Sequence, residues 1–494
     1  MIIAQEKHFI KATEEFEAML EWIDQADGKG ADEEGLRIDQ VERDLFARLL
    51  ALGFRLLEAY VAKSGCGDAG ETLQREDRVL RRSTEPHRRR YVSIFGELML
   101  ERFVYAVRAK QKIEHAPLDE QLGLPQGECS YVLEDWLQKL CVKDSFAEGV
   151  QTLHDWLGVK LNVRGAEAIN RRMSQHAESY RESQSPPPAE EEGEIMVLAG
   201  DGKGVPMRRP LEERIQGKKR RGKGEKKNKK QMAYVGAVYT IDRYRRTVDD
   251  VVDEVQRKQR AADRPKPQHK RVWVEMTRQR EDAPANGKTR LFARLGVEVE
   301  SRKADQDQPI VCLMDGERAL WAAMREWLPE RTVGILDLYH VMARFSRMKG
   351  LWKAAHCFHA EKSGAAEEFV TARLRMLLDG KVGYLIGGLR RKLADLCGAK
   401  RKRLLSVIGY LNNNRSHMRY DEYLAAGYPI GSGVIEGACR HVVKDRMELS
   451  GMRWTVDGAQ SMLYLRSIYL NGDWLEFDEH RIQAEQDTLY RKAA

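Results

Sequence analysis

Residues 309–315 read Pro-Ile-Val-Cys-Leu-Met-Asp, an uncharged run that ends in an aspartate. A run without polar alternation predicts a central strand that is buried on both faces of its sheet. The carboxylate of Asp315 would then emerge at the carboxyl end of that strand, where an acid can hold a cation. An aspartate in this position can also cap the following helix, so both interpretations of Asp315 stay open.

Residues 195–201 repeat this pattern, because Ile-Met-Val-Leu-Ala-Gly also leads into an aspartate, Asp201. The glycine that follows, Gly202, permits close approach of a metal or a phosphate, although an ordinary Asp-Gly turn explains the same pair. We therefore expect residues 194–209 to form one strand or a bent pair, with Asp201 directly after its buried apolar part.

A third acid, Glu436, lies in the motif Gly-Ser-Gly-Val-Ile-Glu-Gly at the start of a predicted helix. Arg440 and Lys444 follow at helical spacing and would share one helix face with Glu436. The two cations could then hold phosphates beside the acid, or the three residues could form a surface ion-pair ladder.

Carboxylate oxygens are the ligands that Mg²⁺ and Mn²⁺ prefer in proteins. Three converging acids can bind two such ions, which activate an attacking oxygen and stabilise a leaving one. We therefore expect Asp201, Asp315 and Glu436 to be the catalytic, metal-binding residues of one site, with Mg²⁺ or Mn²⁺ as cofactor. Asp337 and His340, where the next predicted strand closes, are expected as accessory residues, although a helix cap and a structural hydrogen bond explain them equally well.

The region 1–182 is mainly helical by its apolar spacing. Within it, residues 88–108 read as two short strands about a glycine, a predicted hairpin flanked by basic residues. Residues 145–180 read as helix, tight turn and basic helix, the outline of a helix-turn-helix, although any helical hairpin shares it. Three prolines and an acidic run at 183–193 predict a linker, since such a segment cannot form a core.

The region 194–345 alternates predicted strands and helices. Its order is a β-meander followed by strand, helix, strand and helix, which is the order of an RNase H-like sheet. A helical stretch, 346–428, separates this sheet from the region 429–475 that carries the last acid, and 476–494 reads as a C-terminal tail. We expect an α/β RNase H-like catalytic core with an all-α insertion, preceded by a mainly helical N-terminal DNA-binding region.

The positive charge of the chain is clustered, although 84 Lys and Arg only modestly exceed 76 Asp and Glu in its 494 residues. Clustered basic side chains suggest a polyanionic partner, but solvated surface is the commoner explanation of any single run. A basic loop at 218–230 would hold phosphates without reading bases. Trp454 could stack on an unpaired base or simply pack in the core. The predicted DNA-binding residues are Lys218, Lys219, Arg220, Arg221, Lys223, Lys226, Lys227, Lys229, Lys230, Arg440, Lys444, Arg446, Arg453 and Trp454.

The seven cysteines include no CxxC pair, which argues against a disulfide framework and against a thiolate zinc site. The first residues lack a signal-peptide pattern, and no apolar stretch approaches the roughly 20 residues that span a bilayer. We therefore expect a cytoplasmic protein without a membrane partner.

Four motifs occupy residues 201–207, 314–321, 336–340 and 431–447. Their order resembles that of the ISKra-type insertion-sequence transposases, bacterial mobile-element enzymes of the DDE class. The resemblance extends over residues 90 to 475. Some members of the family carry a cysteine pair after the hairpin, whereas residues 106–112 of this chain hold none, which argues against zinc-dependent DNA recognition here.

The resemblance implies an RNase H-like catalytic domain whose metal-binding acids are Asp201, Asp315 and Glu436. It also implies double-stranded DNA partners, namely transposon ends and target DNA, and a nucleoid-associated location in a bacterium. Pairing two ends needs at least two active sites, so we expect a homodimer or higher oligomer on DNA. The expected function is that of a DNA transposase, which binds terminal inverted repeats and catalyses metal-dependent strand cleavage and strand transfer.

Two other classes of protein fit the same residues. A non-catalytic DNA-binding regulator derived from a transposase needs only the helix-turn-helix outline and the basic runs. A structure-selective RNase H-like nuclease would use the three acids to cut branched DNA without joining strands.

Overall fold

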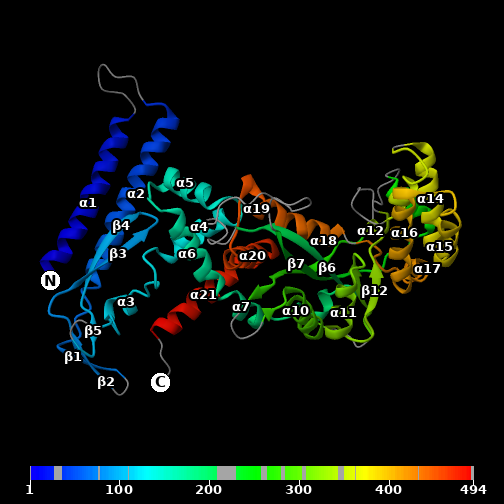
Figure 1. Cartoon of the computed structure of the whole chain (residues 1–494). Coiled ribbons are helices and arrows are strands. Elements are labelled where there is room, and N and C mark those ends of the chain that lie inside the picture. Colours follow the sequence, from blue (N-terminus) through cyan, green and yellow to red (C-terminus); the bar gives the residue numbers. More distant parts are fainter. Residues whose placement is uncertain are drawn as a thin grey trace, which may run out of the picture. The chain divides into compact units, whose positions relative to one another are not determined.

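The computed structural model divides the chain into two compact units, Met1–Tyr180 with Trp474–Ala494, and Arg181–Asp473 (Figure 1). Each unit buries apolar side chains of its own, such as Leu133 in the first and Val197 in the second. The structure describes residues 2–26, 36–75, 78–108, 111–208, 230–256, 264–279, 284–302, 307–342, 350–361, 363–431 and 433–490.

The first unit combines two long helices, short strands and a group of shorter helices. Its helices are α1 (Ile2–Gln25), α2 (Ile38–Lys63), α3 (Pro117–Gln121), α4 (Tyr131–Cys141), α5 (Phe146–Leu157), α6 (Val163–Ser174) and α21 (Trp474–Leu489), and α7 (Ala177–Ser183) leads into the second unit. Its strands are β1 (Thr72–Arg75), β2 (Arg78–Arg82), β3 (His87–Ser93), β4 (Gly96–Arg102) and β5 (Tyr105–Ala106).

The predicted hairpin is confirmed, because β3 and β4 pair antiparallel along their whole length. Leu98 and Leu100 on β4 form a small core with Leu124, against which Phe54 of α2 packs. The end of the predicted segment differs, since β5 pairs with β2 rather than with the hairpin. Side chains alternate between the two faces of a strand, so Leu98 and Leu100 place one face of β4 in the core of this unit.

The helices predicted over 145–180 are also present. Ser145 caps α5 by accepting a hydrogen bond from Glu148 N at 3.0 Å, and Gly158 ends it at φ 68°. Asn162 then caps α6 by accepting one from Gly165 N at 2.8 Å. Caps of this kind satisfy backbone groups that a helix end leaves open, so the turn between the two helices is well defined.

The prediction of a C-terminal tail over 476–494 is wrong, because α21 continues to Leu489 and belongs to the first unit. One face of this helix is buried, with Phe477 fully inside. Arg481 is also buried, and it donates to Glu134 of α4 at 3.1 Å. Glu134 further pairs with Arg172 of α6, so one buried carboxylate ties three helices together.

The second unit contains the main sheet and most of the helices. Its strands are β6 (Ile195–Pro206), β7 (Lys230–Ile241), β8 (Gln268–Met276), β9 (Arg278–Gln279), β10 (Pro284–Ala285), β11 (Ile310–Met314) and β12 (Val333–Leu336). Its α-helices are α9 (Val248–Val255), α10 (Gly287–Arg302), α11 (Arg318–Trp327), α12 (Leu338–Met342), α13 (Leu351–Ala355), α14 (Gly364–Leu378), α15 (Val382–Arg391), α16 (Gly398–Asn413), α17 (Tyr420–Ala425), α18 (Gly433–Ala438), α19 (Asp445–Met447) and α20 (Val456–Asn471). Short turns complete it: η1 (Ala189–Glu191), η2 (Arg415–His417), the π-helical turn η3 (Cys439–Lys444) and η4 (Leu449–Gly451).

The five-stranded sheet has the order β12-β11-β6-β7-β8. β7 runs antiparallel to both β6 and β8, whereas β11 is parallel to β6 and to β12. All five residues of β11 are buried, as its uncharged sequence predicts for a central strand. The carboxyl ends of β6, β11 and β12 consequently lie at one edge of the sheet.

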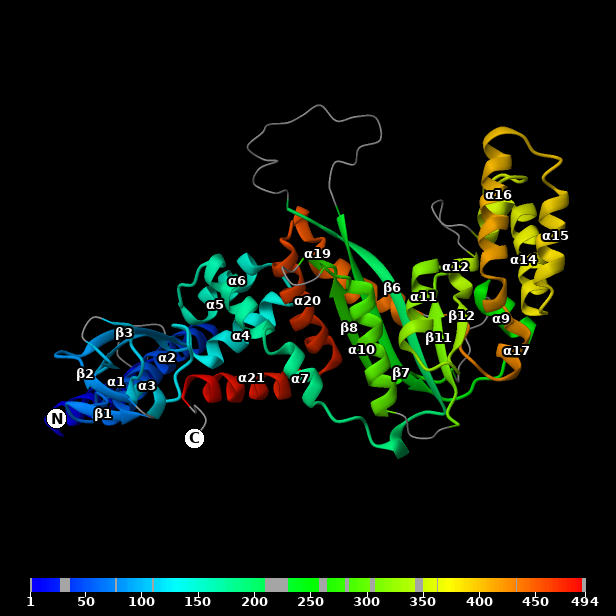
Figure 2. The same ribbon diagram turned by 60° about the horizontal axis from the view of Figure 1, so that its bottom comes forward.

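Helices protect the sheet on a face and at an edge. α10 packs against β7 and β8 (Figure 2), and Leu291 of this helix lies against Gly236. On α20, the Gln460 side chain accepts from Met276 N at 2.7 Å and donates to Val274 O at 2.9 Å. These contacts satisfy backbone groups of the edge strand β8 that would otherwise be open to another strand.

The segment predicted as a linker, 183–193, is anchored at its end. Glu192 is almost fully buried and forms an ion pair with Arg302 of α10 at 2.8 Å, and its carboxylate also accepts from Thr240. Composition alone suggested a free acidic run, but one of its acids has a buried cation as its partner. This pair fixes the entry of the chain into β6.

The helical stretch predicted over 346–428 contains α13 to α17. Leu374, Leu389, Leu404 and Leu411 supply its buried core, as their spacing predicted. In Figure 2, α14, α15 and α16 stand side by side, and α16 packs against both α13 and α15. Among the described residues, no helix has the length and apolar character that crossing a bilayer requires.

Candidate functional site at the carboxyl ends of three parallel strands

Asp201 and Asp315 lie next to each other at the carboxyl end of the sheet. The pairing of β6 with β11 ends at Gly200 and Met314, and each aspartate is the residue that follows. The prediction of one strand or a bent pair over 194–209 is confirmed in its first form, because β6 continues past the apolar run to Pro206, and Asp201 lies within this strand, paired with Val235 of β7. The strand extends because β7 supplies partners along its whole length, so Asp201 marks the place where β6 leaves β11.

The backbone around Asp315 forms a tight turn into α11. Gly316 has φ 88°, and a Cβ there would lie 2.7 Å from Leu336 Cδ1. Oδ1 of Asp315 accepts a hydrogen bond from Glu317 N at 2.8 Å, and Glu317 rather than Asp315 is the N-cap residue of α11. Tyr410 donates its hydroxyl to Asp315 O at 2.9 Å, so the helical stretch also holds this turn.

Asp337 and His340 follow the third parallel strand, β12. The N–H of Asp337 donates to Met314 O at 2.9 Å, which places it beside the end of β11, and its side chain is 1% exposed. Oδ1 of Asp337 accepts from Tyr339 N at 2.7 Å and lies 3.9 Å from His340 Nδ1. The Asp337 carboxylate thus accepts a backbone hydrogen bond in the turn into α12, and the same carboxylate lies near the His340 ring.

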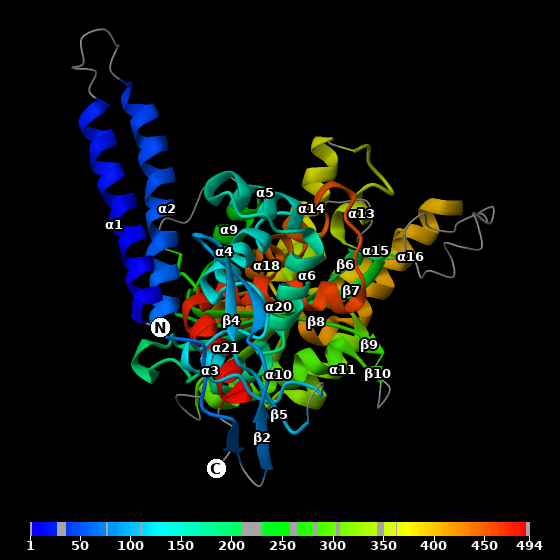
Figure 3. The same ribbon diagram turned by 90° about the vertical axis from the view of Figure 1, so that its left-hand side faces the viewer.

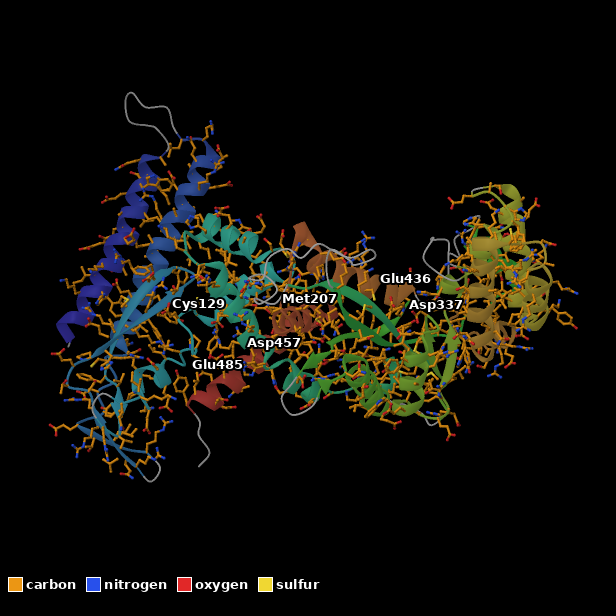
Figure 4. The ribbon with its side chains drawn as sticks, viewed as in Figure 1. Cys129, Met207, Asp337, Glu436, Asp457 and Glu485 are labelled. Atoms are coloured by element: carbon orange, nitrogen blue, oxygen red, sulfur yellow. The ribbon has the colours of Figure 1, made fainter. Side chains whose placement is uncertain are left out.

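Four acids share one electrostatic environment at this edge. Burial of the Asp315 carboxyl raises its pKa, and the negative charge of Asp201 adds to that increase. The pKa of Glu436 is raised as well, by partial burial first and then by the charge of Asp337, with a further contribution from Asp201. Figure 4 shows Glu436 and Asp337 close together, although they come from α18 and from the end of β12.

His340 supplies a positive charge among these acids. Burial disfavours its charged ring, but the carboxylate of Asp337, 3.9 Å from Nδ1, together with the charges of Asp315 and Asp201, raises the pKa of His340 to about 9. The ring is therefore protonated at neutral pH and partly offsets the repulsion between the carboxylates. The sequence suggested His340 as an accessory residue, and the structure brings it to the predicted acids.

Cys439 belongs to this site, although sequence reasoning did not single it out. Its thiol lies 3.5 Å from Asp201 Oδ2, to which it donates, while Gly202 N donates to Asp201 Oδ1 at 2.6 Å. Burial followed by the charge of Asp201 raises the pKa of Cys439 far above its usual range, so the thiol stays protonated. Its position three residues after Glu436 was the available signal, since such a residue lies one helical turn further along.

The prediction that Glu436, Arg440 and Lys444 share an α-helical face is wrong in detail. The chain from Cys439 to Lys444 is π-helical, and the wider turn changes the spacing. All three side chains are nevertheless exposed. Within the described residues no ion pair joins Glu436 to either cation, so the alternative of a surface ladder is also not formed.

Two residues that were expected to contact DNA are part of the core. Arg446 is fully buried, and its guanidinium lies over the Trp454 ring at 5.0 Å. Trp454 is 8% exposed and donates its Nε1–H to Met447 O at 3.1 Å. The backbone of Trp454 also donates to Pro206 O at the end of β6 and accepts from Arg208 N just beyond it, so neither ring nor guanidinium is available to a base or phosphate.

The remaining predicted DNA contacts have different outcomes. Arg453 is exposed, and Lys230 at the start of β7 pairs with Glu448. The rest of the basic loop lies outside the described residues, namely Lys218, Lys219, Arg220, Arg221, Lys223, Lys226, Lys227 and Lys229.

The donor chemistry of the site suits Mg²⁺ or Mn²⁺, because carboxylate oxygens from two aspartates and a glutamate are hard ligands. Burial and then repulsion between the acids raise the pKa of Asp315 and of Glu436, and a divalent cation would relieve the repulsion. In the described part of the chain, no group of three or more His, Cys, Asp and Glu side chains is arranged closely enough to hold a metal ion. As placed in this structure, Asp201, Asp315 and Glu436 therefore do not form a ready-made metal site.

Comparison of the sequence with protein-family models and with curated proteins finds no match.

Proposed function

We propose that this chain is a DNA transposase of the DDE class, which cuts and joins DNA with the help of divalent metal ions. The observation that carries the proposal is the placement of Asp201 and Asp315 side by side at the ends of two parallel strands. Glu436 of α18 shares the electrostatic environment of Asp201 although it lies 235 residues further along (436 − 201). Three acids gathered from distant parts of a chain are the arrangement that metal-dependent phosphoryl transfer needs.

The sheet supports an RNase H-like core as the fold of the second unit. In order of appearance, its five long strands lie third, second, first, fourth and fifth across the sheet, with only the second antiparallel to the first. This is the β-meander followed by two parallel strands that the sequence predicts. The helical stretch α13–α17 lies between the last strand and Glu436, which agrees with an insertion before the last acid.

The residues of the chain divide the work as follows. Asp201, Asp315 and Glu436 would hold the metal ions, which when bound lower the pKa of an attacking water or 3′-hydroxyl and stabilise the leaving oxygen. Cys439 and Gly202 each donate to a different oxygen of Asp201 and so fix the plane of its carboxylate. Protonated His340 keeps the cluster from carrying the full charge of its acids and can donate to a phosphate oxygen.

Binding of DNA is assigned to exposed basic residues. Arg440, Lys444 and Arg453 follow Glu436 in the sequence and are exposed, so they can hold phosphates close to the acids. The helix pair α5–α6 in the first unit is proposed to recognise the terminal repeats, with the basic loop adding affinity without base readout. The protein would act on the nucleoid of a bacterial cytoplasm.

The test uses the purified full chain and DNA that carries the sequences flanking its coding region, with inverted repeats as the expected substrate ends. We expect strand cleavage and joined product with Mg²⁺ or Mn²⁺ and none with EDTA. Asp201→Asn, Asp315→Asn and Glu436→Gln should each abolish both products while the protein still shifts the DNA in a gel. Full cleavage by any of these variants would refute the assignment.

The two rival classes give different results in the same assay. Binding of the ends without metal-dependent cleavage would identify a DNA-binding regulator. Cleavage of branched DNA without joined product would identify a nuclease.

A further inference from the structure

The helical hairpin α1–α2 exposes an unusual amount of apolar surface. In Figure 3 the two helices run side by side and antiparallel. Contacts between them agree, since His8 lies 3.6 Å from Glu58 and the Arg48 guanidinium lies 4.6 Å from the centre of the Trp22 ring. These pairs show which residues of the two helices lie opposite each other. For each facing pair, the residue numbers on α1 and α2 add up to about 66–70.

Four of the five large apolar residues that are exposed on α1 form one stripe, and Ile10, which is 56% exposed, lies outside it. Phe9, Phe16, Leu20 and Ile23 are each 45–49% exposed. Their spacing of seven, four and three residues confines them to roughly 60° of the helix circumference at 100° per residue. The seam with α2 lies elsewhere on this helix, where Ala12 and Met19 are buried.

A second stripe follows α2. Phe46, Leu49, Leu56 and Tyr60 are 46–61% exposed, and their spacing confines them to roughly 80° of the circumference. Ile38, at the start of the helix, continues the stripe. The buried residue on the side of α1 is Ala59.

Both stripes lie on the same side of the hairpin. On each helix the stripe is rotated by roughly 90° from the seam, in the direction of increasing residue number. Because the helices are antiparallel, equal rotations turn the two stripes toward one common side. Phe95 in the β3–β4 turn packs over Gly53 and borders this surface, which we call the hairpin face.

The size of the hairpin face matches a protein interface. Nine large side chains at these exposures leave roughly 800 Å² of mainly apolar surface, whereas the largest patch on a typical monomer covers roughly 300–600 Å². A standard interface buries about 800 Å² on each partner. A membrane surface is a poor alternative, since α1 carries Glu14, Glu15, Glu17, Glu21 and Asp24, which anionic lipids repel.

We propose that the hairpin face binds the hairpin face of a second copy of this chain, forming a four-helix bundle about a two-fold axis. A self-complementary apolar patch of this size is what an isologous dimer requires. Charge selects the pairing of α1 with the partner's α2. Two acidic α1 helices would repel each other. When α1 instead faces the α2 of the second copy, Asp24 of one copy lies at the same level as Arg43 of the other.

The test compares three forms of the full chain without DNA, by sedimentation equilibrium over a range of concentrations. Wild type should have twice the mass of one chain. Phe16→Glu/Leu49→Glu places two charges on the hairpin face and should sediment as a monomer, with dimer affinity reduced at least 100-fold. Ala18→Glu/Ala47→Glu adds the same two charges on exposed positions of the same helices away from the stripes, and should remain dimeric.

Helical circular dichroism checks that the variants fold, and Phe16→Ser/Leu49→Ser replaces the charged form if it does not. A monomeric wild type at about 50 µM would overturn the proposal, and so would a dimer that survives both substitutions on the hairpin face. Equal loss of dimer in the control variant would overturn it too. Since no DNA is present, either result leaves the proposed transposase activity to be judged separately.

Discussion

Asp201 and Asp315 stand at the same level of two neighbouring parallel strands, one residue beyond the pair Gly200 and Met314 that closes the ladder between them. Neither acid is placed there by a local motif. The parallel register of β6 and β11 brings them together. The charge of Asp201 then adds to the increase in the pKa of Asp315 that burial causes. A site of this kind is held by the sheet, so its two central acids should tolerate loss of charge without loss of fold.

The first prediction concerns Asp315→Asn. Asparagine keeps the oxygen that accepts from Glu317 N but removes a charge that burial and Asp201 disfavour. Cleavage should fall by at least about 10²-fold, while the free energy of unfolding of the metal-free protein stays equal or rises by up to about 1 kcal/mol. Urea unfolding and a cleavage assay check the two parts, and a destabilised variant would contradict the electrostatic argument.

The second prediction concerns metal binding itself. Ca²⁺, as a divalent probe, should raise the midpoint of thermal unfolding of the wild type, because a ligand at 100 times its Kd stabilises by about 2.7 kcal/mol. The increase should be small in Asp315→Asn and in Asp201→Asn, which lack a predicted ligand charge. Equal increases in wild type and both variants would place the ion elsewhere.

The third prediction follows from His340, whose pKa is raised to about 9 in the folded chain against 6.5 as a model value. A raised histidine pKa stabilises the folded state fully below pH 6.5, and this contribution is lost as pH rises toward 9. The limit set by the pKa difference is about 3 kcal/mol. In metal-free protein, the stability lost in His340→Gln should therefore shrink steadily between pH 6.5 and 9, and a constant difference would contradict the assignment.

The fourth prediction tests the turn that carries Asp315. Gly316→Ala must adopt φ 88° and place its Cβ 2.9 Å from Asn414 Nδ2, so we expect a loss of about 2–4 kcal/mol. Gly387→Ala is the matched control, because Gly387 lies in α15 with open space around its Cβ position. Alanine there should stabilise by about 0.5–1 kcal/mol. Differential scanning calorimetry compares the two.

The fifth prediction tests the buried charges of the first unit. Burial raises the pKa of Glu134 to about 7 even though Arg172 and Arg481 favour its ionised form. Arg481→Met removes one of these partners and should destabilise the unit by about 3–5 kcal/mol. Arg171→Met is the control, since Arg171 is 47% exposed and should cost less than about 1 kcal/mol. Limited proteolysis of the first unit follows the effect.

Apolar runs predicted much of the sheet, because a strand buried on both faces must lack charge along its whole length. β11 and the acid after it could be placed in this way, and the order of the strands follows from the order of the runs. Composition left open whether residues 194–209 form one strand or a bent pair, and the pairing of residues 202–206 with β7 makes them one strand.

Other failures have the same physical origin. The π-helical turn after Glu436 and the burial of Arg446 beneath Trp454 depend on packing against distant segments. A tryptophan or an arginine in a sequence carries no mark of which atoms will surround it. Cys439 belongs to the site because its thiol contacts Asp201, and only folding brings these two residues together.

Helix α21 has a consequence for how the protein is made. It contributes Phe477 and Arg481 to the core of the first unit, yet the ribosome adds it only after the whole second unit has been synthesised. At about 5–20 residues per second, the early helices would wait many seconds for their missing neighbour. The unit proposed to recognise DNA would then mature last, so a nascent or truncated polypeptide would be unable to engage the proposed target before the second unit is complete.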